Sequence, residues 1–290
     1  MRRLATCMAM LIFVLGAAPF ASAEVKIGIN APRGELDAMK QWGAIGAYFE
    51  KELGDKVTLV PSKVSNLLQA VEKGDLDFVL ANPVQTIIMK EEHGATPIAT
   101  MNSDTGSQFA GVIIAKKGAG ITKAADLKGK KVMSLDSSAA AAYVFQTYYL
   151  IQKGIDPRKD CAAFVQGKKL DDLVLAVKSG VMDAAFIKSG TLEDMSKEGK
   201  ISRDEFVVVD ERKDPGFSDA HTTPLYPDWY FTATKKASAA VKAKMKDALL
   251  KLSPDHAASK AANIKGFIEA LPLENLKAAL KTLKLRPYDK

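Results

Sequence analysis

Polar side chains follow six short apolar runs of the sequence, at the points where strands are expected to end. They carry hydroxyl, amide, guanidinium and ammonium groups: Arg33, Ser62, Asn82, Ser137, Ser138, Lys168, Lys188, Ser189 and Thr191. In parallel α/β sheets, ligands bind beyond the carboxyl ends of the strands, where loops lead into helix N-termini. Backbone N–H groups and the helix dipole favour negative charge there, and a lysine adds a point charge. These residues therefore predict a binding site for a small anion.

Each of these residues also has a structural explanation when it is taken singly. Asn82, Ser137 and Ser189 are good helix caps whatever the function, and a single lysine is usually a solvated surface residue. The convergence of such residues at strand ends in both halves of the chain favours a ligand site.

His221 lies in the run DAHTTPLYPDWY, which reads as a loop rich in proline and aromatic residues. Such a loop could bring His221 to the mouth of a cleft or could pack against the protein body, and the sequence leaves both open. The other histidines, His93 and His256, are not spaced as metal ligands with one another or with a cysteine. A nucleophile elbow, a phosphate-binding loop and a dinucleotide fingerprint are also missing from the sequence. We therefore predict a binding protein with no enzymatic activity, no cofactor and no metal site.

The elements that must position these residues follow an alternating pattern. From Glu24 onward, short apolar runs alternate with longer runs of helical period, as is typical of an α/β protein. Strands are predicted over 25–30, 56–62, 77–81, 109–118, 125–135, 161–167, 182–190, 206–211 and 228–234, and helices over 35–53, 65–74, 83–94, 136–154 and 169–180.

One helix–strand unit of this pattern occurs twice. Residues 67–83 (LLQAVEKGDLDFVLANP) recur at 173–189 (LVLAVKSGVMDAAFIKS), shifted by 106 positions. Identical residues are Lys63 and Lys169, Leu67 and Leu173, Ala70 and Ala176, Val71 and Val177, Gly74 and Gly180, and Asp77 and Asp183. Helix–glycine–strand units also recur by chance in α/β proteins, but the two copies fall on opposite sides of a presumed crossover, which favours a structural repeat.

The repeat predicts two α/β lobes with a cleft between them. Lobe one should comprise residues 24–110 and 212–290, and lobe two residues 111–211, with crossover strands near 110–115 and 206–211. Asn82 and Lys188 occupy equivalent strand ends in the two copies, so closure of the lobes should bring them to opposite walls of the cleft.

Residues 1–23 have the pattern of a secretory signal peptide. Arg2 and Arg3 precede an apolar run, and Ala21-Ser22-Ala23 is a cleavage site of the A-x-A type. We expect cleavage after Ala23 and export to the periplasm. The remainder has 39 basic and 34 acidic residues. This mild excess, without clustered basic and aromatic residues, excludes a nucleic-acid partner.

Cysteine usage adds one constraint. After cleavage only Cys161 remains, so an intrachain disulfide is excluded. Cys161 could be a reactive thiol, but the run CAAFV reads as the buried start of a strand.

We expect the protein to be a monomer.

The chain resembles the solute-binding proteins of phosphate, phosphonate and phosphite ABC transporters. This resemblance, from about Val25 to beyond Phe231, rests on VKIGIN, LLQAVEKGDLDFVLANP, ADLKGKKV, DSSAAAAYVFQTYYL and LVLAVKSGVMDAAFIKSG. DLKGKKV alone occurs throughout type II periplasmic binding proteins and is therefore not specific, so the ordered set carries the resemblance. The chain is also similar to periplasmic sensor domains of histidine kinases related to tetrathionate sensors, through DFVLANPVQ, KSGTLEDM, HTTPLYPDWYF and LRPYD.

The first resemblance implies a type II periplasmic binding protein fold, in which two crossover strands join two α/β lobes. It implies that a small oxyanion, phosphonate-, phosphite- or phosphate-like, is captured in the interlobe cleft for the membrane permease of an ABC transporter. It puts the oxyanion at Asp136-Ser137-Ser138, although Ala139 to Ala142 follow where phosphonate binders commonly carry a longer Ser-Thr-Ser-Gly-like run. The second resemblance implies a free-standing sensory protein that works with a two-component histidine kinase, with a sulfur oxyanion, a phosphate-like anion or another small anion as its ligand.

Overall fold

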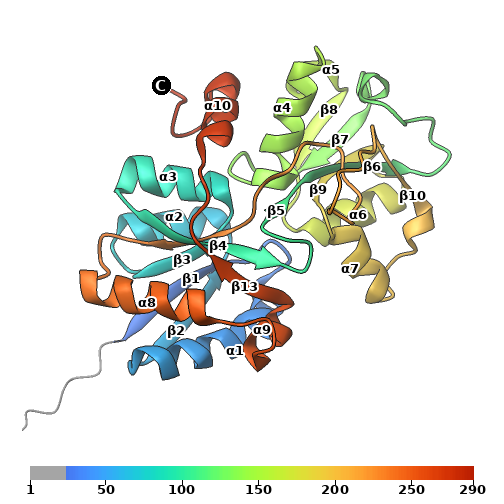
Figure 1. The fold of residues 1–290 in the computed structure, drawn as a ribbon. Helices are drawn as coiled ribbons and strands as arrows, with labels where there is room; N and C mark the ends of the chain where they lie inside the picture. Colours follow the sequence, from blue (N-terminus) through green and yellow to red (C-terminus); the bar gives the residue numbers. More distant parts are fainter. Residues whose placement is uncertain (1–23) are drawn as a thin grey trace, which may run out of the picture.

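Two lobes of mixed α/β structure make up the part of the chain that the computed structural model describes, residues 24–290 (Figure 1). The predicted signal peptide, residues 1–23, lies outside the described residues. No helix within residues 24–290 is both long and apolar enough to cross a membrane.

Lobe one is a six-stranded sheet with helices on both faces. Its strands are β1 (Val25–Asn30), β2 (Val57–Ser62), β3 (Phe78–Ala81), β4 (Thr96–Ser103), β12 (Tyr230–Ala233) and β13 (Ile264–Ile268), in the order β13-β4-β12-β3-β1-β2. Its helices are α1 (Glu35–Leu53), α2 (Val64–Glu72), α3 (Pro83–His93), α8 (Ala239–Lys251) and α9 (Ala257–Ala262). Because helices cover both faces, β3 is buried along its whole length.

Lobe two is a five-stranded sheet of related design. Its strands are β6 (Gly111–Lys116), β7 (Lys131–Ser134), β8 (Ala163–Gln166), β9 (Ala184–Lys188) and β10 (Phe206–Val208), in the order β10-β6-β9-β7-β8. Its helices are α4 (Val144–Gln152), α5 (Pro157–Asp160), α6 (Leu170–Lys178) and α7 (Thr191–Lys197), with short 3-10 turns at Ala124–Leu127, Ala140–Ala142 and Arg203–Glu205.

The predicted helix over 136–154 is wrong in its first half. Helix α4 begins only at Val144, after a compact turn in which the Leu135 N–H donates to the Ala142 carbonyl at 3.0 Å. Tyr143 breaks the helical path with φ −158° and ψ −64°. Asp136, Ser137 and Ser138 therefore lie in a loop and do not start a helix.

The repeat seen in the sequence is present in the structure. Helices α2 and α6 each have nine residues, and two residues beyond each helix end lies a glycine with positive φ, 75° at Gly74 and 78° at Gly180. Each lobe places its three parallel strands in the same order, β3-β1-β2 and β9-β7-β8, and an antiparallel strand lies next to β3 and to β9.

The chain crosses between the lobes at a small two-stranded ribbon. Its strands are β5 (Gln108–Phe109) and β11 (Tyr226–Pro227), which pair antiparallel. The sequence placed the crossovers near 110–115 and 206–211, but those residues belong to β6 and β10, neighbouring strands of the lobe-two sheet. The segment between β10 and β11 also stays with lobe two, because the N–H groups of Thr222 and Thr223 both donate to the Gly111 carbonyl. The predicted boundary at 211 therefore moves to about residue 225.

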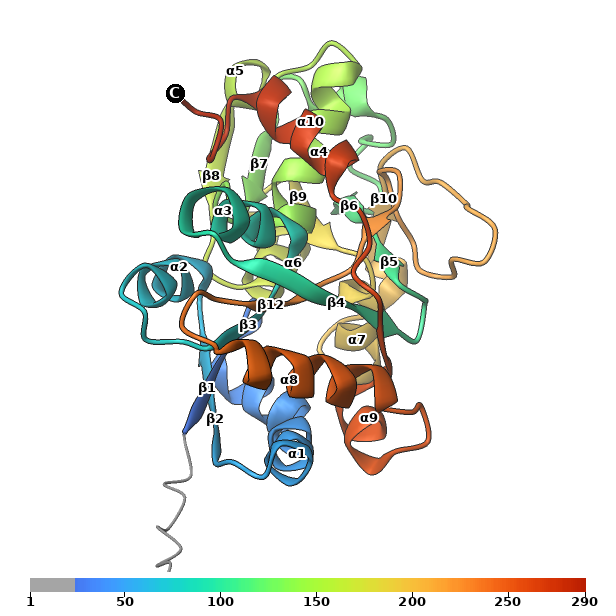
Figure 2. The same ribbon diagram turned by 60° about the vertical axis from the view of Figure 1, so that its left-hand side comes forward.

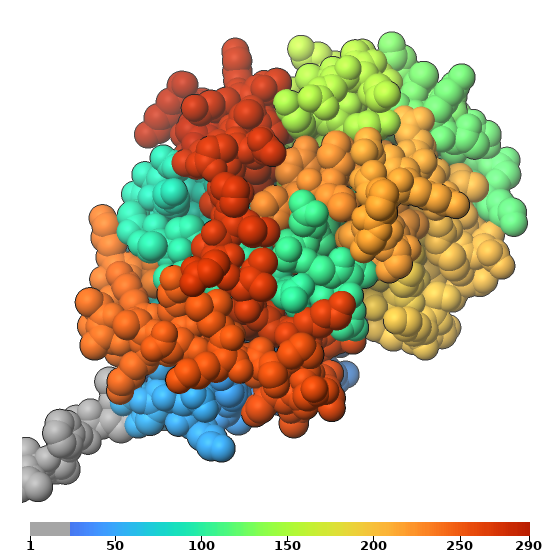
Figure 3. All heavy atoms as spheres, viewed as in Figure 1, coloured from blue at the N-terminus to red at the C-terminus, as the bar shows by residue number. Residues whose placement is uncertain are grey.

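The C-terminal helix α10 (Glu274–Leu283) packs against both lobes (Figures 2 and 3). Toward lobe one, the Lys277 Nζ lies 2.8 Å from a carboxylate oxygen of Glu91 on α3. Toward lobe two, α10 packs on α4, and the Arg158 guanidinium donates to the Leu283 carbonyl at 3.4 Å. The prediction that residues 212–290 belong wholly to lobe one is therefore wrong at this end as well.

Cys161 lies directly before β8 and is half-buried. Its thiol donates to the Leu127 carbonyl at 3.5 Å. Burial is the main reason that its pKa is raised to about 11, with Asp160 and Asp156 adding to the effect. A thiol of such high pKa carries little thiolate at neutral pH, in keeping with a structural role.

Candidate functional site

The carboxyl ends of six parallel strands, three from each lobe, contribute to one cavity between the lobes. Each strand end supplies one polar side chain to its wall: Asn30 at the end of β1, Lys63 after β2, Asn82 after β3, Asp136 after β7, Lys168 after β8 and Lys188 at the end of β9. We call this space, with a volume of about 60 Å³, the lysine cavity.

The charges that line the lysine cavity favour an anion. Three lysines and one aspartate give its wall an excess of two positive charges. None of these lysines takes part in an ion pair found within residues 24–290. The Lys188 Nζ lies 5.7 Å from the centroid of the Phe109 ring, which also lines the cavity. The three ammonium groups are therefore available to a ligand.

Apolar side chains complete the wall of the lysine cavity. Phe109 and Trp229 come from the crossing segments, and Ala139–Ala142 come from the turn before α4. Alanine side chains are short, so they allow the backbone of this turn to approach the cavity closely. The small volume and mixed wall suit a compact ligand better than a long one.

A larger hollow of about 540 Å³ adjoins the lysine cavity, and we call it the wide cavity. The two share Asn30, Ala31, Pro32, Leu170, Lys188 and Trp229. The wide cavity adds charged residues of both signs from α1 and α7, as well as Trp42. Both tryptophans of the chain, Trp42 and Trp229, therefore line the cleft.

Buried Asp228 lies beside Trp229 in the chain. Burial raises the pKa of its carboxyl, and the positive charge of Lys188 opposes this only in part. The Asp228 Oδ1 accepts from the Trp229 N–H at 2.8 Å. This contact helps to fix the segment that carries Trp229 into both cavities.

The predicted site residues fall into three groups. Asn82, Lys168 and Lys188 line the lysine cavity. Arg33, Lys188, Ser189 and Thr191 line the wide cavity. Ser62, Ser137, Ser138 and His221 are not among the residues of the described chain that line either one.

The serines outside the cavities have local or bridging contacts. The Ser62 hydroxyl accepts from the Asn66 side chain at 3.2 Å. Ser138 lies close to the cleft, because its carbonyl accepts from the Asn82 Nδ2 at 3.2 Å, but its own N–H donates to Asp136 at 2.9 Å. Ser138 thus connects the lobes through its backbone.

His221 is held inside lobe two. Its side chain is fully buried, and its Nδ1 and Nε2 lie 2.9 Å from the Asp219 carbonyl and 3.3 Å from the Asp214 carboxylate. The Phe217 ring packs edge-on against it. Of the two positions that the sequence left open for this loop, the structure has the packed one.

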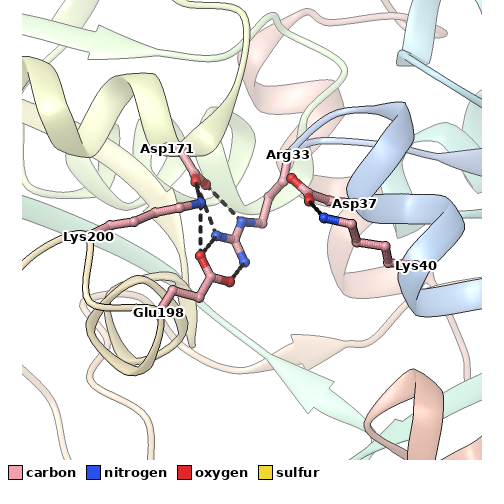
Figure 4. A network of polar contacts seen from close by, with 6 residues as sticks. All are labelled: Arg33, Asp37, Lys40, Asp171, Glu198 and Lys200. Carbon is pink, nitrogen blue, oxygen red and sulfur yellow. Dashed lines mark hydrogen bonds and ion pairs between the residues drawn. The ribbon is translucent and has the colours of Figure 1, made fainter.

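Arg33 lines the wide cavity, but its guanidinium is occupied by two carboxylates of lobe two (Figure 4). Its Nε lies 2.8 Å from Asp171, and its Nη1 lies 2.8 Å from Glu198. With its donors turned to these partners, Arg33 binds the opposite lobe.

Several residues of the lysine cavity escaped the sequence-based prediction, among them Asn30, Lys63, Phe109 and Trp229. Lys63 carried a usable signal, since it directly follows the second strand and has its counterpart at Lys169 in the repeat. Phe109 and Trp229 lie on the crossing segments, and their position depends on where the chain passes between the lobes.

The family model described as ABC transporter, phosphonate, periplasmic substrate-binding protein matches residues 27–274. Among curated proteins, the tetrathionate sensor histidine kinase TtrS of Salmonella typhimurium is 29% identical over 229 residues. That match takes in 77% of this chain but only 38% of the length of the relative.

Solved structures of phosphonate-binding proteins have the same fold. PhnD1 from Prochlorococcus marinus, in complex with methylphosphonate, matches with a TM-score of 0.75 at 18% identity, over 90% of this chain and 98% of that one. A binding protein component of an ABC phosphonate transporter from Pseudomonas aeruginosa matches with a TM-score of 0.75 at 15% identity, over 89% of this chain and 85% of that one. The predicted bilobed type II periplasmic binding fold is confirmed, and the chain belongs to the periplasmic substrate-binding proteins of phosphonate ABC transporters.

Proposed function

We propose that the protein captures a small oxyanion of the phosphonate, phosphite or phosphate type in the lysine cavity and delivers it to the membrane permease of an ABC transporter. The observation that carries the proposal is the convergence of six polar side chains, one from each of six strand ends, on one small cavity with an excess of two positive charges. Both lobes contribute to it, so a bound ligand would hold them together.

The chemistry of the wall suits a compact dianion. Lys63 from lobe one, and Lys168 and Lys188 from lobe two, supply point charges on three sides. The N-terminus of α3, capped by the Asn82 side chain, adds the positive end of a helix dipole. The methylphosphonate in the PhnD1 complex, a small oxyanion with one apolar substituent, supports a ligand of this class.

The proposed function requires a location outside the cytoplasmic membrane and binding without chemical conversion of the ligand. Export by residues 1–23, with cleavage after Ala23, would put it in the periplasm as a monomer that binds its ligand without converting it. Within residues 24–290 no group of three or more histidine, cysteine or acidic residues could hold a metal ion. Binding through lysines and backbone donors requires none.

The experiment is a binding panel on the protein from Glu24 onward. Methylphosphonate, phosphite, phosphate, sulfate, thiosulfate and tetrathionate are titrated by calorimetry, with tryptophan fluorescence as a second readout because Trp229 lines the lysine cavity. We expect tight binding of at least one phosphorus oxyanion. Mass spectrometry of small molecules released from the purified protein identifies any ligand that it carries from the cell.

Two variants connect binding to the lysine cavity. Lys188→Ala should weaken binding at least tenfold, because hydrogen bonds to charged groups contribute about 1.5–3 kcal/mol each. Lys128→Ala, an exposed lysine of lobe two, is the matched control and should bind normally. Unchanged affinity in Lys188→Ala would move the ligand out of the lysine cavity.

A second candidate function is favoured by the curated relative, a tetrathionate sensor histidine kinase. In that case the protein would be a sensory module that presents a sulfur oxyanion, or its own closed form, to a separate kinase. Tetrathionate or thiosulfate would then be the tight ligand of the panel. Permease and ATPase genes beside the coding gene favour transport, and a kinase gene with a regulator favours sensing.

A further inference from the structure

Arg33 makes ion pairs across the cleft with partners that are far away in the sequence. It lies in the loop between β1 and α1 of lobe one, whereas Asp171 begins α6 and Glu198 follows α7 in lobe two (Figure 4). Its Nε and Nη2 donate to the Asp171 carboxylate at 2.8 and 3.1 Å. Its Nη1 and Nη2 donate to the Glu198 carboxylate at 2.8 and 2.7 Å. The planar guanidinium thus binds two carboxylates in a forked manner, which a lysine cannot do.

Lys200 completes a balanced cluster of charges. Its Nζ lies 2.7 Å from Asp171 and 2.9 Å from Glu198, so two positive and two negative groups meet. The Arg33 and Asp171 side chains are 21% and 14% exposed, whereas Glu198 is 40% exposed. The Arg33–Asp171 half of the cluster is therefore shielded from solvent more than an ordinary surface ion pair.

Other contacts beside the cluster also join the lobes. The Leu170 N–H donates to the Pro32 carbonyl at 3.1 Å, and the Asn82 Nδ2 donates to the Ser138 carbonyl at 3.2 Å. Gly34 has φ 117°, and the Lys169 side chain packs against it so closely that a Cβ there would lie 3.2 Å from Nζ. All of these contacts are made between groups of the chain itself.

We propose that Arg33 is a latch residue, which holds the two lobes closed through Asp171 and Glu198 and so raises ligand affinity without touching the ligand. The closed form is then populated before ligand arrives. A ligand that contacts both lobes has an apparent dissociation constant equal to the intrinsic value divided by the closed fraction. The latch therefore tightens the binding of any ligand of the cleft, and the inference goes beyond the proposed oxyanion function.

The test uses ligand-free protein, so that it is independent of the identity of the ligand. Small-angle X-ray scattering gives the closed-to-open ratio, and acrylamide quenching of Trp42 and Trp229, which both line the cleft, reports how open the cleft is. Arg33→Gln removes the latch, and Arg212→Gln is the matched control, since Arg212 pairs with Asp214 inside lobe two. Arg33→Lys keeps the positive charge but cannot make the forked contacts to two carboxylates.

We expect the closed-to-open ratio of ligand-free Arg33→Gln to fall about tenfold, as for the loss of roughly one charge-assisted contact. Arg33→Lys should regain part of this ratio, and Arg212→Gln should match the unmodified protein. Raising the salt concentration from about 0.02 to about 0.5 M should lower the ratio of the unmodified protein but hardly that of Arg33→Gln. The double variant Arg33→Gln/Glu198→Gln should be no more open than Arg33→Gln, because both changes remove the same interaction.

A ligand-free protein that is fully open at low salt would overturn the latch, as would an Arg33→Gln variant with an unchanged ratio. Methylphosphonate then serves as a second probe. Its dissociation constant should rise in Arg33→Gln by the factor by which the closed fraction falls. If methylphosphonate does not bind even to the unmodified protein, the proposed function fails, but the latch is still decided by the ligand-free measurements.

Discussion

The unit α2–β3 of lobe one and the unit α6–β9 of lobe two share a backbone plan but differ in the residues at their strand ends. In lobe one, the Asp77 carboxylate accepts from the Lys26 N–H at 2.9 Å, and the Asp77 N–H donates back to the Lys26 carbonyl. In lobe two, Asp183 and Lys131 make the same reciprocal pair of bonds. Each aspartate thus joins the start of β3 or β9 to the start of the neighbouring parallel strand, β1 or β7.

The difference lies at the opposite ends of the same strands. β3 is followed by Asn82, a neutral side chain whose Oδ1 caps α3 by accepting from the Val84 and Gln85 N–H groups. At the equivalent position β9 ends in Lys188, and the N-cap of α7 is Gly190. The two copies therefore share the hydrogen bonds at the starts of their strands. They differ in the charge at the carboxyl ends of the strands, which face the cleft. Lobe two supplies two of the three lysines of the lysine cavity together with Asp136, whereas lobe one supplies Lys63 and the capped N-terminus of α3.

The largest effect, on ligand affinity, is expected when the residue at the end of β9 is made the same as the residue that follows β3. Lys188→Asn copies the lobe-one residue into lobe two and should weaken methylphosphonate binding by about 3 kcal/mol, or over a hundredfold, because a charged contact in a partly desolvated cavity is lost. Titration calorimetry measures the change. The free energy of unfolding should stay within about 0.5 kcal/mol, since Lys188 caps no helix. A tenfold loss or less would mean that charge on lobe two matters little.

The hydrogen bonds made by Asp77 and Asp183 should contribute unequally to the free energy of unfolding, although their geometry is the same. Asp77 is buried and also binds the Lys236 Nζ at 3.0 Å, whereas Asp183 is less buried. We expect Asp77→Ala to lower the free energy of unfolding by about 2 kcal/mol and Asp183→Ala by about 1 kcal/mol. Urea denaturation of both variants checks this. Equal losses would show that the extra contact of Asp77 contributes nothing.

Asn82→Ala tests the neutral strand end of lobe one. It removes the cap of α3 and the contact with Ser138, so we expect a loss of about 1 kcal/mol in the free energy of unfolding. Thermal unfolding followed by circular dichroism measures it. Lys188→Ala, at the equivalent position, is the control and should leave the melting temperature nearly unchanged. Similar losses in both variants would contradict the division between capping and charge.

The smallest effect near neutral pH is expected at the latch, where Arg33 of lobe one meets Asp171 and Glu198 of lobe two. Hydrogen bonds from Arg33 are the main reason that the pKa of Glu198 is lowered to about 2 in the closed form. Burial by itself raises the pKa of Asp171, but bonds from Arg33 and Lys200 lower it overall. A lowered pKa means that the contribution to closure is complete above the ordinary carboxyl value of about 4 and is lost as the pH falls toward 2.

The closed-to-open ratio of ligand-free protein should therefore be constant between about pH 8 and pH 5 and should fall below about pH 4. Small-angle scattering across this range measures it, and Arg33→Gln is the control that should lack the acid-dependent step. A ratio that changes between pH 8 and pH 5 would point to groups outside the latch.

Residues fixed by local pattern were predicted well from the sequence. The carboxyl ends of parallel strands meet at one edge, so Asn82, Lys168 and Lys188 could be brought together from strand positions alone, and the structure has all three in the lysine cavity. The repeat was recognisable because a glycine with positive φ and a strand-starting aspartate each have a strict local requirement.

Features that depend on long-range partners could not be predicted. Arg33 was assigned to the ligand, but its partners lie 138 and 165 positions away, and nothing in its own segment indicates them. The sequence predicts a strand over 206–211, of which only Phe206–Val208 form β10, and the pairing of β10 with β6 shows that this segment stays within lobe two. The start of α4 depends on a hydrogen bond from Leu135 that closes the preceding turn.

Cys161 makes the protein convenient for single-molecule work. Maleimide dyes react with the thiolate, and a thiol whose pKa is about 11 is ionised in only about one molecule in ten thousand at pH 7. An exposed engineered cysteine with an ordinary pKa of about 8.5 would carry more thiolate and would therefore react faster. Donor and acceptor dyes could therefore be attached to one new cysteine on each lobe while the native residue stays unmodified. Energy transfer between the two dyes would then report the opening and closing of the lobes in single molecules.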